Sequence, residues 1–282
     1  MSKKAVKISQ KESKITIHYH TLDADKINPD DLNQFGTDYR ALFEFLKDYF
    51  IDHDVELSST EDTIDLHQEA IVDIDLTPCK NFPNLTQVVL GYNPIILIDL
   101  SPLSECEKLE NLFFDQCQTL FEIDLSPLSK CPNFKTITFR GDPIQKIDLS
   151  AFENSNLEWL ELPHTFLSEV DLSPLANCQK LRYVAVDDNR LEQIDLAPLA
   201  NCTNLTTLYL NMNRLKEIDL TPLETCKKLE DIHLNDNLYA SLDLTPLASC
   251  PNLQKVLVDD VEIIAPEEGL PGLYKMERRS EE

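Results

Sequence analysis

Residues 181–202 read LRYVAVDDNRLEQIDLAPLANC, and this stretch decides how the chain folds. Its first half places the apolar Val184 and Val186 two residues apart, which is the period of a β-strand. Its second half contains an aliphatic-Asp-Leu tripeptide, which recurs with the aspartate at positions 75, 99, 124, 148, 171, 195, 219 and 243. Because these positions are separated by steps of 23 to 25 residues, the sequence predicts a stack of similar structural units.

Written as a consensus, the unit is LxxLxLxxNxLxxIDLxPLxxC, and the copies that begin at Leu181, Leu205 and Leu229 match its first half closely. The sequence therefore resembles the leucine-rich repeat family, and the IDLxPLxxC half is similar to arrays of prokaryotic or archaeal type. The resemblance implies an α/β fold, namely a curved solenoid with a parallel β-sheet on its concave face. The residues agree, since a return path of about 20 residues permits parallel stacking of one strand per repeat.

The side chain at the asparagine position of the consensus is expected to bond the backbone where the chain turns out of the strand. This position is occupied by Asn93, Cys117, Asp142, Thr165, Asn189, Asn213, Asn237 and Val261. Only Val261 lacks a side chain that can form hydrogen bonds, which indicates that the stack is ending there. Further along each repeat, triplets such as Ser101-Pro102-Leu103 indicate an N-cap followed by proline at the first helical position. We therefore expect a short helical or 3-10 turn on the convex side, with an irregularity at Ser150, where the proline is missing.

Three segments are predicted along the chain. Residues 1–60 form an N-terminal α/β cap with a strand and an amphipathic helix, residues 61–265 form the solenoid, and residues 266–282 form a C-terminal tail or cap. The solenoid has a degenerate first rung at residues 61–73 and eight repeats. The helix is expected to begin at Asn28-Pro29, and its apolar face comprises Leu32, Phe35, Tyr39, Leu42, Phe43, Leu46 and Phe50. We expect it to cover the open apolar end of the stack, the alternative being a docking helix for a partner.

The composition excludes several functions. The chain has 282 residues, of which 50 are acidic and 25 basic, so a nucleic acid would be repelled by the formal charge of -25. The presence of only 5 glycines argues against glycine-rich phosphate loops and calcium-binding β-rolls. The N-terminus lacks the apolar core of a signal peptide, and no stretch approaches about 18 apolar residues. We therefore expect a cytoplasmic monomer that does not bind membranes.

Six of the eight cysteines form one column, seven residues after the repeated aspartate: Cys106, Cys131, Cys178, Cys202, Cys226 and Cys250. A row of thiols suggests a metal cluster, but the sequence has no CxxC pair, and zinc needs ligands that converge from several directions. We therefore expect reduced cysteines that are buried in the core. His18 and His20 would share one face of a strand, but two ligands do not make a metal site.

The repeated aspartates are a second column, and carboxylates stacked at strand spacing repel one another. In one interpretation each carboxylate accepts backbone N–H groups from the following turn. In the other, the column is a rail for hard cations such as Ca²⁺. The scarcity of glycine favours the first interpretation, so no metal and no cofactor is predicted.

The variable residues beside the inward leucines are expected to point to the concave surface. Aromatic residues edged by carboxylates predict a partner-binding site on this surface. The predicted site residues are Phe113, Trp159, Glu161, Tyr183, Asp187, Asp188, Tyr209, Met212, Asp231, His233 and Asp236.

No Ser-His-Asp or Cys-His pairing can be located on the repeats, so the chain is predicted not to be an enzyme, and no catalytic residue is assigned. The predicted function is a non-enzymatic protein-protein interaction module that binds a partner with a basic surface on the concave face. The main alternative is an assembly element that associates with itself through its caps or its convex surface. A calcium-binding acidic solenoid is the third hypothesis.

Overall fold

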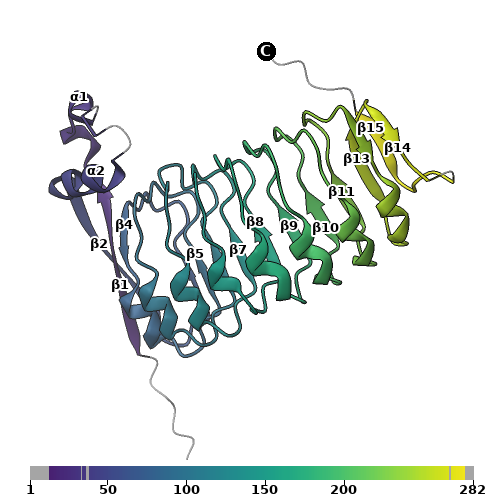
Figure 1. Ribbon diagram of the computed structural model, residues 1–282. Coiled ribbons are helices and arrows are strands. Elements are labelled where there is room, and N and C mark those ends of the chain that lie inside the picture. The colour runs from purple at the N-terminus through teal and green to yellow at the C-terminus, as the bar shows by residue number, and fades with distance from the viewer. Residues whose placement is uncertain (1–12, 33, 36–37, 267, 277–282) are drawn as a thin grey trace, which may run out of the picture.

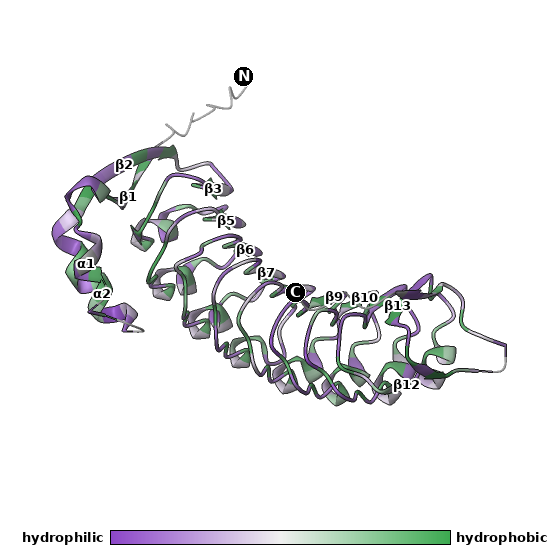
Figure 2. Cartoon of the chain, turned by 90° about the horizontal axis from the view of Figure 1, so that it is seen from above, coloured by the Kyte–Doolittle hydropathy of each residue, from purple (hydrophilic) through white to green (hydrophobic). Residues whose placement is uncertain are grey.

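A computed structural model describes residues 13–32, 34–35, 38–266 and 268–276 of the chain. The repeats form a curved solenoid (Figure 1), and the strands of its main sheet lie along the inner side of the curve (Figure 2). Ten strands form this sheet in the order β15-β13-β11-β10-β9-β8-β7-β6-β5-β3. Their bounds are β3 (Thr63–Asp65), β5 (Gln87–Val89), β6 (Asn111–Phe113), β7 (Thr136–Thr138), β8 (Trp159–Glu161), β9 (Tyr183–Ala185), β10 (Thr207–Tyr209), β11 (Asp231–His233), β13 (Lys255–Asp259) and β15 (Leu273–Met276). The predicted leucine-rich repeat solenoid is confirmed, including the first rung, which contributes β3.

The strands pair in parallel, and equivalent residues of neighbouring repeats lie side by side. Val184 of β9 pairs with Leu160 of β8 and with Leu208 of β10, and all three side chains are fully buried. The middle residue of each short strand therefore points into the core, and the two residues that flank it point to the concave surface.

Amide side chains bond the turns that follow the strands. The Oδ1 atom of Asn189 accepts the N–H of Leu167 at 3.1 Å, and its Nδ2 atom donates to the carbonyl oxygens of Leu162 at 2.9 Å and Val186 at 3.1 Å. Equivalent bonds are made by Asn93, Asn213 and Asn237. The predicted role of the asparagine position is confirmed for these residues.

Short 3-10 turns lie along one edge of the solenoid, below the strands in Figure 1. Their bounds are Thr77–Asn81, Ser101–Glu105, Ser126–Lys130, Ser150–Phe152, Ser173–Asn177, Ala197–Asn201, Thr221–Thr225 and Thr245–Ser249. The turn that begins at Ser150 is the shortened one, as the missing proline predicts. The N-cap prediction is wrong in one respect, because Ser101 is the first residue of its turn and its N–H is bonded by Asp99 Oδ1 at 2.8 Å. The aspartate therefore caps the turn, and the proline that follows has no N–H to satisfy.

The N-terminal end of the solenoid is covered by a strand. β1 (Lys14–Leu22) pairs antiparallel with β2 (Phe50–Ser58) on one side and with β4 (Asp73–Asp75) on the other. Ile17 of β1 is fully buried and packs into the core of the solenoid. β1 thus covers the end of the stack, so the prediction that the amphipathic helix covers this end is wrong.

The prediction of one amphipathic helix through Phe50 is wrong. The segment forms two helices, α1 (Pro29–Leu32) and α2 (Tyr39–Leu46), joined to the strands by 3-10 turns at Ala24–Lys26 and Lys47–Tyr49. Asp38 begins α2, since its side chain accepts the N–H of Ala41 at 3.0 Å. Phe50 is not part of a helix but the first residue of β2.

The helix α2 packs on the flank of the second and third rungs. Its residues Phe43 and Leu46 are buried together with Ile96, and Tyr39 stacks on Phe121 with ring centroids 3.6 Å apart. This contact fixes the helices to the side of the solenoid rather than to its end.

The C-terminal end adds two strands beyond the last full repeat. β14 (Glu262–Ile264) pairs with β12 (Ser241–Asp243), and β15 pairs in parallel with β13 as the tenth strand of the main sheet. The structure thus assigns a strand to residues 273–276, for which the sequence predicted a tail or cap. Within the described part of the chain, no helix has the length and apolar character needed to cross a bilayer.

Candidate partner-binding face

Four aromatic rings form a continuous row on the concave face: Trp159, Tyr183, Tyr209 and His233, from β8 to β11. The rings of Trp159 and Tyr183 stack with centroids 3.8 Å apart, and those of Tyr209 and His233 stack at 4.2 Å. Tyr183 meets Tyr209 edge-on at 5.6 Å and so joins the two stacked pairs. We call these four residues the aromatic row. Stacking holds the rings in place before any partner arrives.

Asp231 anchors the C-terminal half of the aromatic row. The hydroxyl of Tyr209 donates to this carboxylate at 2.9 Å, and the Nε2 atom of His233 lies 2.9 Å from its other oxygen. Burial raises the pKa of Tyr209 to about 12, and burial lowers the pKa of His233. Both rings are therefore uncharged at neutral pH, and the negative charge of this part of the face belongs to Asp231.

Glu161 anchors the N-terminal half. The Nε1 atom of Trp159 donates to Glu161 at 3.1 Å, and Glu161 also forms an ion pair with Arg140. The Glu161 side chain is buried and the Arg140 side chain is half exposed. This arrangement reduces what Glu161 can offer a cationic partner, because Arg140 already neutralises its charge.

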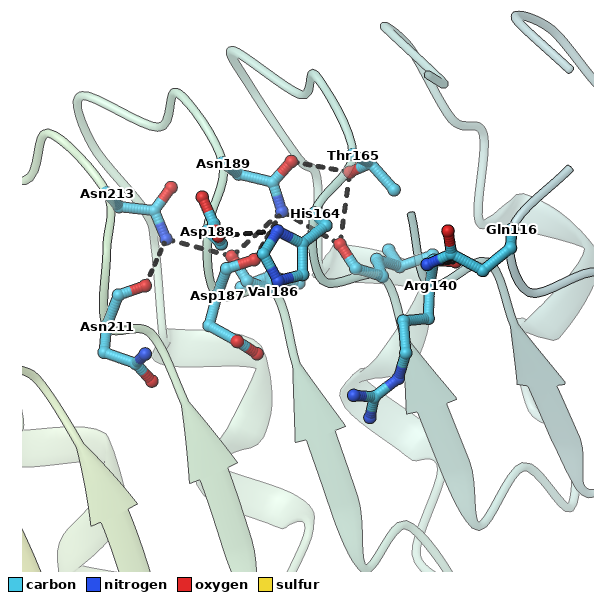
Figure 3. A network of polar contacts seen from close by, with 11 residues as sticks. Gln116, Arg140, His164, Thr165, Val186, Asp187, Asp188, Asn189, Asn211 and Asn213 are labelled. Carbon is cyan, nitrogen blue, oxygen red and sulfur yellow. Dashed lines mark hydrogen bonds and ion pairs between the residues drawn. The ribbon is translucent and has the colours of Figure 1, made fainter. Parts of the chain in front are cut away.

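A column of polar side chains runs beside the aromatic row, at the second residue after strands β7, β9, β10 and β11. It comprises Arg140, Asp187, Asn211 and Asn235. Figure 3 shows three of them, and Asp187 lies between Arg140 and Asn211 along the solenoid. The Oδ1 atoms of Asn211 and Asn235 are buried and have no hydrogen-bond partner within the described residues. Because these two oxygens have almost no exposed surface, they are not available to a donor on another molecule.

Two carboxylates occupy neighbouring positions in this region. Burial raises the pKa of Asp187 to about 6, so its carboxylate is mostly ionised at neutral pH. Asp188 lies next to it in a turn with a positive φ of 51° and pairs with His164 Nδ1 at 2.6 Å, as Figure 3 shows. Met212 and Asp236 occupy the same turn position in the next two repeats, with φ of 56° and 55°.

The structure thus brings most of the predicted site residues together, but not all of them. Phe113 lies on β6, and β7 with Thr138 separates it from Glu161. Arg140 was not among the predicted site residues, although it lies at the position equivalent to Asp187, because its contact with Glu161 of the next repeat cannot be read from the sequence. Whether these residues bind a partner stays a prediction.

Sequence reasoning also missed Tyr274. This residue lies on β15, pairs with Leu257 of β13 and has an exposed side chain. It lines a hollow of about 520 Å³ together with Asp231 and Lys255. Residues 273–276 lack the repeat consensus, and the only available signal was the alternation of Leu273, Tyr274, Lys275 and Met276. The concave face therefore extends one strand further than the period indicates.

The repeated aspartates bond the backbone and the cysteines are buried, as predicted for each column. Every repeated aspartate accepts the N–H of the residue two positions later, at 2.8–2.9 Å. All eight cysteines are free and buried, and burial raises the pKa of the Cys202 thiol to about 12. Among the residues that the structure describes, no three His, Cys, Asp or Glu side chains are grouped so as to hold a metal ion.

These features define a leucine-rich repeat solenoid, a class of fold that supports protein interaction in general. The model of the BspA type leucine-rich repeat region matches residues 73–181 and 122–254 in six copies, and the chain belongs to this family. No curated protein sequence gave a significant match.

Two solved structures from Listeria monocytogenes are similar to this chain, which agrees with the prokaryotic type of repeat. Internalin C2 is 28% identical, with a TM-score of 0.57, and the match covers 70% of this chain and 80% of that chain. Internalin InlF is 25% identical, with a TM-score of 0.55, and the match covers 74% of this chain and 65% of that chain.

Proposed function

We propose that the chain is a non-enzymatic module that binds another protein on its concave face, and that the bound surface is basic. The aromatic row carries this proposal. Its rings lie next to one another across four strands, are held by Glu161 and Asp231, and remain partly accessible to solvent. Large aromatic side chains that are rigid before binding are the residue type most often found at the centre of protein interfaces.

The charge of the face supports a basic partner. Asp187, Asp231 and Asp236 lie along or beside the aromatic row, and the formal charge of the whole chain is -25. Arg140 and Lys255 are the nearby cations, and Arg140 is already paired with Glu161. A basic surface would therefore be attracted over long range and would meet carboxylates on arrival.

We also propose that the protein acts as a monomer in the cytoplasm. The free, buried cysteines support this location, because a reducing compartment keeps thiols unpaired. Size-exclusion chromatography with light scattering over a range of concentrations tests the monomer, and a mass that rises with concentration would favour self-assembly.

The experiment that tests the binding face is affinity capture from the source cell with three forms of the protein. The forms are the native chain, Trp159→Ala and Tyr92→Ala. Tyr92 is a matched control, because it is an exposed aromatic residue outside the aromatic row. A basic protein retained by the native chain and by Tyr92→Ala, but lost from Trp159→Ala, supports the proposal. Partners that all bind Trp159→Ala as well as the native chain would contradict it.

A further inference from the structure

A groove crosses the outer side of the solenoid, and the proposed function does not use it. It spans four consecutive repeats, has a volume of about 820 Å³ and is formed by the segments that contain the repeated aspartate. Figure 2 shows one segment of this kind, β12, on the outer side of the curve and away from the main sheet. The core of the solenoid therefore separates this groove from the aromatic row.

The groove has an apolar floor and charged rims. Each repeat contributes an extended tripeptide, whose central Ile or Val packs against the core while its two neighbours point outward. The floor residues are Ile147, Val170, Ile194 and Ile218. The rims are formed by Asp171, Asp195 and Asp219 on one side and by Lys146, Glu169, Gln193 and Glu217 on the other. Five carboxylates thus face one lysine.

The rim carboxylates are accessible to another molecule. Asp195 and Asp219 each accept one backbone N–H through Oδ1, at 2.8 Å and 2.9 Å, which orients the carboxylate while its side chain stays exposed. Glu169 and Glu217 are exposed too, and neither forms an ion pair with any residue that the structure describes. Positive charge placed over these rims would therefore gain attraction that the chain itself does not supply.

The spacing of the repeats selects the shape of the bound element. Parallel strands are about 4.8 Å apart, and the outer side of a curved stack is spread slightly wider. One turn of an α-helix rises about 5.4 Å, so a helix lying along the groove presents roughly one turn to each repeat. An extended chain rises about 3.3 Å per residue, so neither one residue nor two residues match the spacing of the repeats.

We infer that this groove binds a basic amphipathic α-helix of a partner protein. The apolar stripe of the helix lies on the Ile and Val floor, and its lysine or arginine side chains extend over both rims. Four repeats accommodate about three helical turns. The inference concerns a second surface and does not depend on what binds the concave face.

The probe is a synthetic peptide of about three to four helical turns, with leucines at i, i+3, i+4 and i+7 and lysines on both flanks. A peptide of the same composition, with leucines and lysines placed so that they do not segregate on a helix, controls for charge alone. Fluorescence anisotropy at physiological salt measures the dissociation constants for the native chain and for three variants. The variants are Glu169→Gln with Glu217→Gln on the rim, Gln193→Glu on the same rim, and Glu107→Gln with Glu224→Gln as a control away from the groove.

We expect the amphipathic peptide to bind and the rearranged peptide to bind at least tenfold more weakly. Removing two rim charges should weaken binding by about three- to tenfold, because each exposed ion pair contributes little. Gln193→Glu, which adds a carboxylate to the rim, should strengthen it. The control pair at Glu107 and Glu224 removes the same charge and should change binding less than twofold.

Three results would overturn the inference. They are no binding of the amphipathic peptide, equal binding of both peptides, or equal weakening by the rim pair and by the control pair. Titration of a fourth variant, Trp159→Ala, gives a fourth such result, since loss of binding there would place the peptide on the concave face instead. All substituted rim and control residues are exposed, so each variant keeps the packing of the core.

Discussion

Asp142 occupies the position at which four other repeats have an asparagine, and this makes the stability of the fold depend on pH. The side chain is fully buried, and its Oδ1 atom accepts the N–H of Cys117. Its Oδ2 atom has no hydrogen-bond partner among the described residues, whereas Asn189 uses Nδ2 at this place to donate to two carbonyl oxygens. A carboxylate has no hydrogen to donate, but a neutral carboxyl group has one.

Burial raises the pKa of Asp142 to about 8, so the carboxyl group holds its proton in the folded protein at neutral pH. The unfolded chain has a pKa near 3.9 for the same group and releases the proton. The folded state therefore binds more protons than the unfolded state between about pH 4 and pH 8, and stability falls as pH rises through this window. At about 1.4 kcal/mol per pH unit, the loss between pH 4 and pH 7 is about 4 kcal/mol.

Asp142→Asn should remove this loss. The amide has the same shape, is uncharged at every pH and supplies the missing donors, so the variant should be more stable than the native chain at pH 7 by up to about 4 kcal/mol. Urea unfolding of both proteins at several values between pH 4 and pH 8, followed by circular dichroism, measures the difference. The gain should grow with pH across this range.

The control for this prediction is Glu107→Gln, which removes an exposed carboxylate and should leave the pH profile unchanged. Parallel profiles of the native chain and Asp142→Asn would show that the buried carboxyl is not protonated in the folded state. A variant less stable than the native chain at pH 7 would refute the proposed match between the amide and the ladder of asparagines.

Four further predictions concern the binding face, the thiols, the end of the stack and metals. With a captured partner, surface plasmon resonance should show faster dissociation for Trp159→Ala and slower, less salt-dependent association for Asp187→Asn. Thiol titration should label Cys202 far more slowly in the native protein than in denaturant, because its pKa is about 12 and it is buried. Ile17→Ala should cost about 2–4 kcal/mol and expose the first rungs to hydrogen exchange. Neither Ca²⁺ nor a chelator should shift the melting temperature. A fall of several degrees on chelation would support the alternative that the column of aspartates binds cations.

The solenoid could be predicted from sequence because the same residue pattern recurs in every repeat. The inward leucines fill the core of each rung. The asparagine at the turn and the aspartate two residues before the 3-10 turn bond backbone groups that recur in every rung. A departure from the pattern also predicted structure, since the missing proline at Ser150 marks the shortened turn. Local chemistry and global fold agree along this part of the chain.

The N-terminal segment could not be predicted in the same way. Its apolar residues keep a helical spacing across the break at Asp38, and Phe50 fits that spacing although it begins β2. The pairing of β1 with both β2 and β4 joins residues that are far apart in sequence. Such pairing depends on tertiary contacts, which override a periodic pattern when the two disagree.

On the concave face, the period predicted which residues share a column but not which of them pair. The contact of Arg140 with Glu161 joins the turn of one repeat to the strand of the next, and the length and direction of the side chains decide it. The stack of Trp159 on Tyr183 follows more directly, because the two residues are register partners on adjacent strands. Columns are a property of the repeat, whereas contacts within a face depend on the particular side chains.

The two surfaces proposed for binding differ in how strongly the fold restricts the residues that can occupy them. On the outer side, Ile194 packs against the core and Asp195 caps a turn, so the repeat requires nearly the same residues at every rung. Such a groove can recognise only a repeating feature, such as the turns of a helix. On the concave side, the side chains of Trp159 and Tyr183 neither fill the core nor cap a turn, so each repeat can have a different residue there. We therefore expect selectivity for one particular partner to come from the concave face, while the outer groove would accept any helix with the right stripe and charge.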